Sequence, residues 1–419
     1  MSFRDLLRDT FHTLAAHKLR TALTMFGITW GVISITLMVA AGEGMRVGFE
    51  RAKAEFGKDV LIVFAGRTSM QAGGTRAGRA IQWTATDHLH VQDASPSCRH
   101  VVPELGRGGL PIRSAHNDAR LLVTGSLPPF AEIRSIGVGE GRYPNWEDDA
   151  RARRVTLLGS DAKEQLFGTR AAVGETVLVG DFPYTVVGVM RRKEQDSNYD
   201  GPDISKVFLP FSTMLRDHPF PPPARPDTVS RLLVTPRDLE HHEACKAEVR
   251  RALARVHGFD PRDEEALGIW DTIDQAKAFG QMTDGMRYFL GAVGVATLFI
   301  GAIGVMNVML VAVRERTREI GVRKALGATR RSIVRQFFVE TLIVVFVSGG
   351  GGLAFAYGVC GLVNLLPQMP YFAGLLPTWQ TGVASVLLLS TVALLSAIYP
   401  ASRAAAVDPI EALRWEAGG

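Results

Sequence analysis

Side chains that can bind metal ions gather in two short stretches of the sequence. Zinc sites use His, Cys, Asp and Glu, but structural zinc sites space their ligands in closed pairs such as C-x-x-C and H-x-x-x-H. Neither stretch has such a spacing, so the sequence predicts no metal site. The residues concerned are Asp87, His88 and His90 in the first stretch, and His241, His242, Glu243 and Cys245 in the second.

Cysteine chemistry is the next candidate. Residues 237–257 have the periodicity of a helix, and Cys245 lies on its apolar face. We therefore favour a buried structural cysteine at this position. A disulfide with Cys98 stays open, because a long sequence separation says nothing about proximity in the fold. The apolar face comprises Cys245, Val249, Ala252 and Val256.

Motifs for nucleophilic, hydrolytic or nucleotide chemistry are missing from the sequence. It contains no G-x-S-x-G, no H-E-x-x-H and no Ser/His/Asp arrangement with a readable spacing. It also contains no G-x-x-x-x-G-K-[ST] phosphate loop, since Gly57-Lys58 lacks both the preceding glycine and the following Ser or Thr. We expect no catalytic residue, no enzyme activity and no cofactor in this chain.

The helices that organise the chain are predicted from stretches of sequence without charged residues. The composition, 47% hydrophobic and 21% charged, excludes intrinsic disorder. Residues 21–42, 288–313 and 341–402 contain no Asp, Glu, Lys or Arg, whereas about 20 apolar residues span a bilayer. Pro367, Pro370 and Pro377 divide the last stretch into two spans. The predicted fold class is a membrane protein, α-helical with four transmembrane helices, plus a large α+β extracytoplasmic domain inserted between helices 1 and 2.

The predicted segments follow one another along the chain without overlap. They are a cytoplasmic amphipathic helix at 1–20, transmembrane helix 1 at 21–42, the extracytoplasmic domain at 43–284, transmembrane helix 2 at 285–313, a cytoplasmic coupling helix at 314–335, transmembrane helix 3 at 336–366, transmembrane helix 4 at 378–400 and a cytoplasmic tail at 401–419. Strands of the domain are predicted at 59–64, 155–159, 176–179 and 184–189, the last two forming a hairpin around Gly180-Asp181.

Loop charge sets the orientation. Residues 314–335 are rich in Arg and Lys, whereas 366–378 carry neither, and basic loops stay in the cytoplasm. Both termini are therefore predicted to be cytoplasmic, in a bacterial inner or plasma membrane. The net charge of +5 comes partly from these loops, so we expect no nucleic-acid partner.

The second span is rich in glycine. Gly291, Gly294, Gly301 and Gly304 lie among apolar residues, and glycine lets helices approach closely in lipid. We expect close helix packing there, within the chain or in a dimer. Asn307 is the most polar side chain of this span, and no span has a charged centre. The missing charges argue against an ion channel or a proton-coupled carrier.

The loop after the second span has the signals of a short independent helix. Val322, Ala325 and Leu326 share one face, and Glu319 lies four residues before Arg323, the favourable order for an ion pair. Gly327 can take the left-handed conformation that ends a helix, and Thr329 can cap the helix that runs into the third span.

Four stretches together resemble the MacB/FtsX-like permeases of ABC transporters. TREIGVRKALGATRRSIVRQFFVET resembles the cytoplasmic coupling segment of that family, KLRTALTMFGITWGVISI its first span, and YPASRAAAVDPIEALRWE its C-terminal end. GEGRYPNWEDDARARRVTLLGSDAKEQLFGTRAAVGETVLVGDFPYTVVGVM is similar to its periplasmic core. Within the C-terminal stretch, Asp408, Pro409 and Glu411 suit the start of a last short helix.

The resemblance implies partners and a mechanism. A separate ABC ATP-binding subunit would bind ATP and Mg²⁺, a second permease chain, identical or related, would complete a dimer, and an adaptor or membrane fusion protein would be a further partner beside membrane lipid. Movement of the coupling helices would then reach the outside domain, as mechanotransmission in efflux or lipoprotein-type transport. The alternative is a membrane-anchored extracytoplasmic sensor or hydrolase. The expected ATPase contact comprises Glu319, Gly321, Arg323, Ala325, Leu326 and Gly327.

Overall fold

The computed structural model describes residues 18–56, 59–72, 74, 76–193, 199–367, 372–406 and 408. These form two compact units, unit 1 from Met1–Phe49 with Gly280–Gly419 and unit 2 from Glu50–Phe279. The chain passes between the units within two long helices, α2 (Lys18–Phe56) and α9 (Thr272–Glu315). Most of the amphipathic helix predicted at 1–20, and the C-terminal helix predicted after Asp408, lie outside the described residues.

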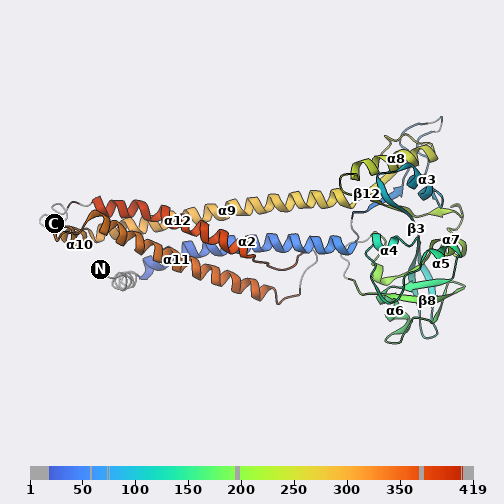
Figure 1. Cartoon of the computed structure of the whole chain (residues 1–419), viewed down its shortest axis with the longest axis horizontal. Helices are drawn as coiled ribbons and strands as arrows, with labels where there is room; N and C mark the ends of the chain where they lie inside the picture. Colours follow the sequence, from blue (N-terminus) through green and yellow to red (C-terminus); the bar gives the residue numbers. More distant parts are fainter. Residues whose placement is uncertain are drawn as a thin grey trace. The chain divides into compact units, whose positions relative to one another are not determined.

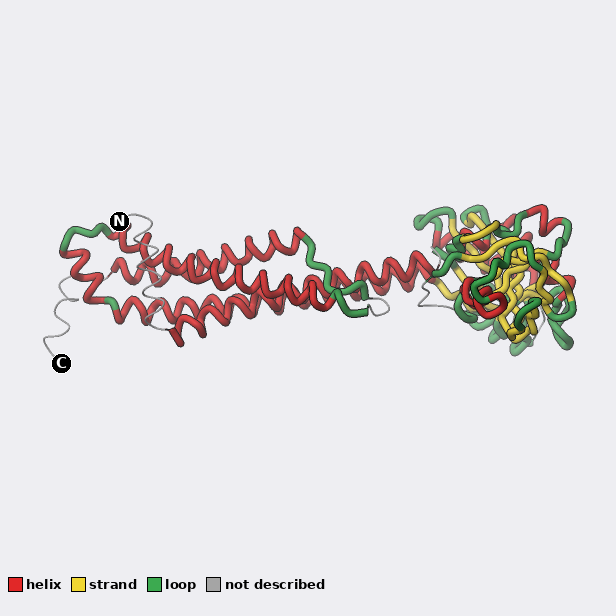
Figure 2. Tube along the Cα trace, turned by 90° about the horizontal axis from the view of Figure 1, so that it is seen from below, coloured by secondary structure: helices red, strands yellow, loops and turns green. Residues whose placement is uncertain are grey.

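Unit 1 is built from helices and loops in its described part (Figures 1 and 2). Besides the unit 1 parts of α2 and α9 it contains α10 (Thr317–Ala325), α11 (Arg330–Val363) and α12 (Trp379–Ala406). Four helices are long and apolar enough to cross a membrane, as the charge-free stretches predict. The candidate spans are Met25–Arg51, Thr272–Glu315, Arg330–Val363 and Gly382–Ala406.

The four long helices share one apolar core in unit 1. Ile28 from α2, Val305 from α9, Phe337 from α11 and Val392 from α12 are all buried in it. Many other apolar side chains on the same helices stay exposed, Phe289 and Ile300 among them. An apolar outer surface is what a helix bundle in lipid presents, because lipid tails replace water around it.

The loop before α12 is held against α2 by main-chain hydrogen bonds. The amide of Ala373 donates to the carbonyl of Gly44 at 2.9 Å, and that of Leu376 to the carbonyl of Ala40 at 3.0 Å. The Asn364 side chain closes the loop from the other side, since it exchanges two 2.8 Å hydrogen bonds with the backbone of Leu375. The loop is therefore a fixed part of the bundle.

Unit 2 has an α+β fold around a ten-stranded mixed sheet in the order β12-β1-β11-β3-β4-β9-β6-β8-β5, with β7 beside β3 and β8. Its strands are β1 (Leu61–Ala65), β3 (Cys98–Arg113), β4 (Asp118–Ser126), β5 (Val138–Gly141), β6 (Val155–Leu158), β7 (Thr176–Val179), β8 (Phe182–Met190), β9 (Lys206–Pro210), β11 (Arg231–Pro236) and β12 (Leu267–Asp271). A separate pair joins β2 (Trp83–Thr84) to β10 (Thr228–Val229). The helices are α3 (Asp87–Ala94), α4 (Phe130–Ile133), α5 (Trp146–Ala150), α6 (Ser160–Phe167), the 3-10 turn η1 (Asp203–Ser205), α7 (Phe211–Asp217) and α8 (His242–His257).

The predicted hairpin is present in the sheet. β7 and β8 pair antiparallel with Val179 opposite Phe182, so Gly180-Asp181 forms the turn. Gly180 has a φ of 57°, which a glycine adopts without strain. The strands predicted at 59–64 and 155–159 correspond to β1 and β6.

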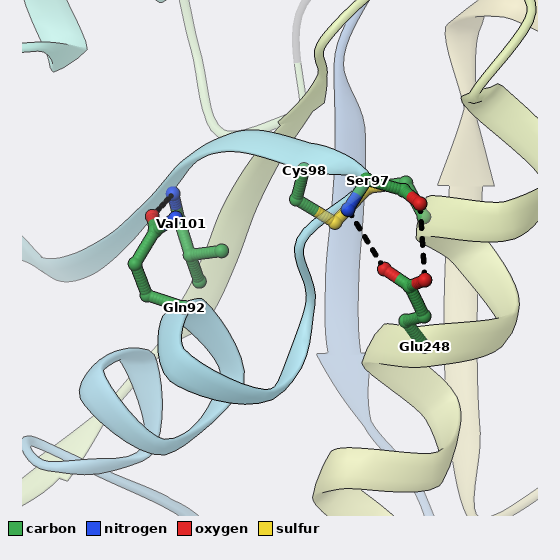
Figure 3. Close-up of a disulfide and its surroundings, with 6 residues drawn as sticks. Gln92, Ser97, Cys98, Val101 and Glu248 are labelled. Carbon is green, nitrogen blue, oxygen red and sulfur yellow. Dashed lines mark hydrogen bonds between the residues drawn. A yellow bond between two sulfur atoms is a disulfide. The ribbon is translucent and has the colours of Figure 1, made fainter.

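Cys98 and Cys245 form a disulfide, the pairing that the sequence left open, and Cys245 is buried as expected (Figure 3). The sheet brings them together: β11 pairs antiparallel with β3 and sets Pro236 opposite Cys98, so α8, which follows β11, begins beside the start of β3. Next to the bridge, the backbone and hydroxyl of Ser97 each donate to the Glu248 carboxylate at 3.0 Å. The expected apolar stripe is wrong at one position, because Val256 is exposed.

Candidate coupling site

Local signals in the sequence shape α10. Glu319 lies in its first turn and Arg323 and Lys324 in its last, which suits the partial charges at the two ends of a helix. Gly327 follows with a φ of 95°, and the Thr329 hydroxyl accepts a hydrogen bond from the Ser332 amide to cap α11. α10 is thus a short helix between α9 and α11, and both predicted end signals are confirmed.

One face of α10 is fixed to the rest of unit 1. Ile320 is only 2% exposed, and Gly321 is buried beside it. Polar contacts add to this anchor: Arg323 donates to Gln336 of α11 at 2.6 Å, and Lys324 donates to the carbonyl of Ala405 in α12 at 3.1 Å. α10 is therefore connected to two spanning helices at once.

An ion pair also connects the residue before α10 to α11. Arg316, the residue before α10, lies with its Nη1 3.4 Å from the carboxylate of Glu340. The Glu340 side chain is 7% exposed, so this carboxylate depends on Arg316 for a cationic partner. Sequence reasoning missed this pair, although Glu340 stands out as the residue that begins the longest charge-free stretch.

The opposite face of α10 is exposed in the part of the chain that the structure describes. Leu326 is 83% exposed and Val322 is 40% exposed, and Ala325 and Gly327 are exposed beside them. Exposed apolar residues that lie together, rather than singly, are typical of a contact surface. The exposed residues thus form a small apolar patch, Val322, Ala325, Leu326 and Gly327, which we call the α10 patch.

The structure divides the predicted ATPase-contact residues into two groups. Ala325, Leu326 and Gly327 belong to the α10 patch, and Glu319 is exposed beside it. Gly321 is buried, and Arg323 is held between Glu319 at 2.5 Å and Gln336 at 2.6 Å. Gly321 and Arg323 therefore lie on the anchored side of α10. The other four residues, Glu319, Ala325, Leu326 and Gly327, are exposed.

Of the four glycines predicted for helix packing, two lie at a close contact between helices and two do not. A Cβ atom at Gly294 would lie 2.2 Å from Ile35 of α2, and one at Gly301 would lie 3.3 Å from the backbone of Gly27. Gly291 and Gly304 have open space at the same position. α9 and α2 thus approach closely along the side marked by Gly294 and Gly301.

Comparison with known proteins places these elements in a family. The model of the MacB-like periplasmic core domain matches residues 21–252, and the model of the FtsX-like permease C-terminal matches residues 291–409. The chain belongs to the MacB/FtsX-like permeases of ABC transporters. The matches reach into both units and include α10, three of the four candidate spans and the part of Thr272–Glu315 from residue 291 onward, and the chain is a multi-pass membrane protein.

Individual relatives differ in how much of their length this permease covers. It is 27% identical to the ABC transporter permease YknZ of Bacillus subtilis, with 99% of this chain and 100% of the relative covered. It is 30% identical to the pyoverdine export ATP-binding/permease protein PvdT of Pseudomonas entomophila and 28% identical to the macrolide export ATP-binding/permease protein MacB of Bdellovibrio bacteriovorus. The permease spans only 60% and 61% of those two proteins. A solved periplasmic region of MacB from Actinobacillus actinomycetemcomitans matches with a TM-score of 0.42 at 18% identity, over 54% of this chain and 95% of that one.

A group of buried charged and polar side chains in unit 2 of the permease is held by mutual contacts. Asp203 accepts from Arg134 and Lys193 at 3.0 and 2.9 Å, and Tyr199 donates to Glu104 at 2.7 Å. Burial alone would raise the pKa of Asp203, but the cations around it lower that pKa to about 2. Glu104 is fully buried, and burial raises its pKa. These charges join α4, η1 and β3 and serve the fold.

The metal-binding residue types seen in the sequence behave differently in the structure. Asp87 pairs with His257 at 2.8 Å, and the His88 ring lies 2.7 Å from the Ala85 carbonyl, so the first stretch does not converge. His241 bonds to Asp238 at 2.7 Å, away from its neighbour. Within the described residues, one group with metal-ligand types does come together, formed by His242, Asp271 and Asp274.

Proposed function

We propose that this permease couples ATP hydrolysis, carried out by a separate ABC ATP-binding subunit, to movement of its extracytoplasmic domain. The α10 patch is the observation that carries the proposal. It is an exposed apolar surface on a helix whose other face is anchored to α11 and α12, so a force applied to the patch acts on two spanning helices.

The proposed topology has four spans and cytoplasmic termini. The basic loop 314–335 then lies in the cytoplasm, where the ATP-binding subunit would meet α10, and unit 2 lies outside the membrane between the first and second spans. The disulfide of unit 2 supports this assignment, because disulfides persist in oxidising compartments.

The proposed transport type is mechanotransmission by a dimer of permease chains. The candidate spans have uncharged centres, which suits a mechanism that needs no hydrophilic path through the bilayer. The relatives named for macrolide and pyoverdine export support an export or efflux role. A periplasmic adaptor is a further proposed partner, and ATP and Mg²⁺ would be bound by the ATP-binding subunit.

Copurification tests the proposal. The full chain is extracted with detergent together with its coexpressed ATP-binding subunit, and the subunit recovered per permease is measured for wild type and Leu326→Asp. We expect the substitution to reduce recovery at least about tenfold, because a charge replaces an apolar contact. Leu365→Asp is the matched control, since Leu365 is 81% exposed but lies after α11, far along the chain from α10.

The outcome separates the two functional classes. Recovery that is normal for Leu365→Asp and lost for Leu326→Asp supports the coupling role. A permease that never recovers an ATP-binding subunit, with transport indifferent to Leu326→Asp, would leave the membrane-anchored sensor or hydrolase as the better account.

A further inference from the structure

A buried imidazole in unit 2 has one nitrogen without a hydrogen-bond partner. His242 is the first residue of α8 and is fully buried. Its Nε2 lies 2.8 Å from the Asp271 carboxylate, whereas its Nδ1 forms no hydrogen bond within the described residues. A buried polar atom left unsatisfied costs about 1–3 kcal/mol, so this nitrogen marks a place where a ligand would stabilise the fold.

Two carboxylates face the same nitrogen. Nδ1 of His242 lies 3.3 Å from Oε1 of Glu243 and 3.9 Å from Oδ1 of Asp274. Two ligands bound at about 2.1 Å to one tetrahedral zinc ion lie about 3.4 Å apart. The observed separations lie on either side of that value, so small side-chain rotations would place all three atoms around one ion.

The other side of the imidazole has the arrangement of a metal-bound histidine. Such a histidine usually contacts a carboxylate through its second nitrogen, which fixes the ring and its tautomer. Asp271 occupies that place on Nε2. Its other oxygen accepts from the amides of Ile273 and Asp274 at 3.0 Å each, so Asp271 also caps the first turn of α9.

Two lysines share the cluster and set its charge. Lys246 lies 3.0 Å from Asp271, 3.0 Å from Asp274 and 3.2 Å from Glu243. Lys246 binds Oδ2 of Asp274, which leaves Oδ1 toward His242, while Lys277 approaches that Oδ1 at 3.6 Å and is half exposed. With a neutral imidazole, three carboxylates and two ammonium groups leave one negative charge, so the cluster still favours a cation.

We propose that His242 Nδ1, Glu243 and Asp274 form a binding site for a first-row divalent transition ion of the Zn²⁺ class, oriented by Asp271. One imidazole with two carboxylates and room for water suits zinc better than calcium or magnesium, which prefer all-oxygen sites. A cavity of about 630 Å³, lined in part by Glu243, Asp271 and Asp274, gives the ion access from solvent.

The site would fasten two helices of unit 2 to each other. Glu243 and His242 lie in the first turn of α8, which the disulfide joins to β3, and Asp274 lies in the first turn of α9. A bound ion would hold the start of α9 to α8 and, through the disulfide, to the sheet. α9 is also the helix that continues into unit 1, so, resting on the proposed coupling function, the ion would stiffen a segment through which that movement passes.

Metal titration of the whole chain tests the proposal. The permease is purified in detergent without a polyhistidine tag, treated with chelator and titrated with Co²⁺, whose visible d–d absorption reports binding. We expect one equivalent per chain, displaced by Zn²⁺. His242→Ala and Asp274→Asn should each weaken binding by about 100-fold, and Asp271→Asn by about 10-fold, because removal of an outer carboxylate costs 10- to 100-fold.

Two variants make the result decisive. His241→Ala is the matched control, because the neighbouring His241 bonds to Asp238 and stays outside the cluster; its affinity should equal wild type. Lys246→Met should bind about tenfold more tightly, because a competing cation is removed. Asp274 is partly exposed, so we expect Asp274→Asn to fold, which a Tm close to that of the metal-free wild type checks. Failure of wild type to bind one equivalent, or binding that survives both His242→Ala and Asp274→Asn, overturns the site.

Discussion

Gly44 of α2 and Gly374 of the loop before α12 are in backbone contact: a Cβ atom on Gly44 would lie 1.7 Å from the Gly374 carbonyl oxygen. Non-bonded atoms do not approach this closely, so Gly44→Ala must push the loop away and break its hydrogen bonds from Ala373 and Leu376. We expect a loss of about 1–3 kcal/mol, visible as a lower Tm of the permease in detergent.

Gly42 provides the control for this substitution. It lies in the same helix, and a Cβ there would meet no atom within 4 Å. Gly42→Ala should keep or slightly raise the Tm, since alanine stabilises a helix interior by about 0.5–1 kcal/mol over glycine. Equal melting of the two variants would show that the loop does not rest on α2.

Close packing of α9 on α2 makes the second prediction. Gly294→Ala places a Cβ 2.2 Å from Ile35 Cγ1, an atom near the backbone that cannot move far. Overpacking of this kind costs about 1–3 kcal/mol, so the Tm should fall. Gly291→Ala, three residues earlier with open space, should keep or slightly raise the Tm, because alanine favours a helix over glycine. Equal Tm values for the two variants would contradict the close contact between Gly294 and Ile35.

The disulfide predicts how many reactive thiols the chain has. The sequence has three cysteines, and Cys360 is buried and free. Chains from a cell that exports unit 2 should therefore show one reactive thiol after denaturation without reductant and three with reductant. Three thiols without reductant would contradict the bridge and the outside location of unit 2. Reduction should also lower the stability of unit 2, typically by about 2–5 kcal/mol.

Features of the sequence that act over a few residues predicted the structure well. Missing charge located the four apolar helices, and Gly327 and Thr329 located the junction between α10 and α11. Such signals are local because a helix closes its hydrogen bonds within a turn. The hairpin around Gly180 was readable for the same reason.

Contacts between segments that are distant in the sequence could not be predicted from it. The disulfide depends on the pairing of β11 with β3, and the Arg316–Glu340 pair depends on how α9 and α11 pack. The side of α9 that meets α2 could not be known either, so Gly291 and Gly304 appeared equivalent to Gly294 and Gly301. His242 joins its partner Asp271 only because α8 packs beside the start of α9.

Acid stability follows from Asp203. Its pKa of about 2 lies below the ordinary value of 3.8 for an aspartate, because Arg134, Lys206 and Lys193 outweigh the effect of burial. A depressed folded pKa stabilises the fold above the unfolded pKa, and this stabilisation, about 2 kcal/mol, is lost as pH falls from about 4 to 2. The free energy of unfolding, measured by tryptophan fluorescence, should fall more steeply with decreasing pH in that window. Asp203→Asn should be less stable at neutral pH and should lose this part of the pH dependence; an unchanged profile would contradict the assignment.

The anchor of α10 gives the last prediction. Arg316→Ala leaves the Glu340 carboxylate, whose side chain is 7% exposed, without its cationic partner, so the permease should lose about 1–3 kcal/mol and melt at a lower temperature. Glu340→Gln in the same chain removes the stranded charge and should restore much of the loss, because a neutral amide is cheaper to bury. Arg331→Ala, at an exposed position in the first turn of α11, is the control for removing an arginine and should change the Tm little. If the double variant melts no higher than Arg316→Ala alone, the two side chains do not act as a pair, and α10 is held to α11 chiefly by Ile320 and by the contact between Arg323 and Gln336.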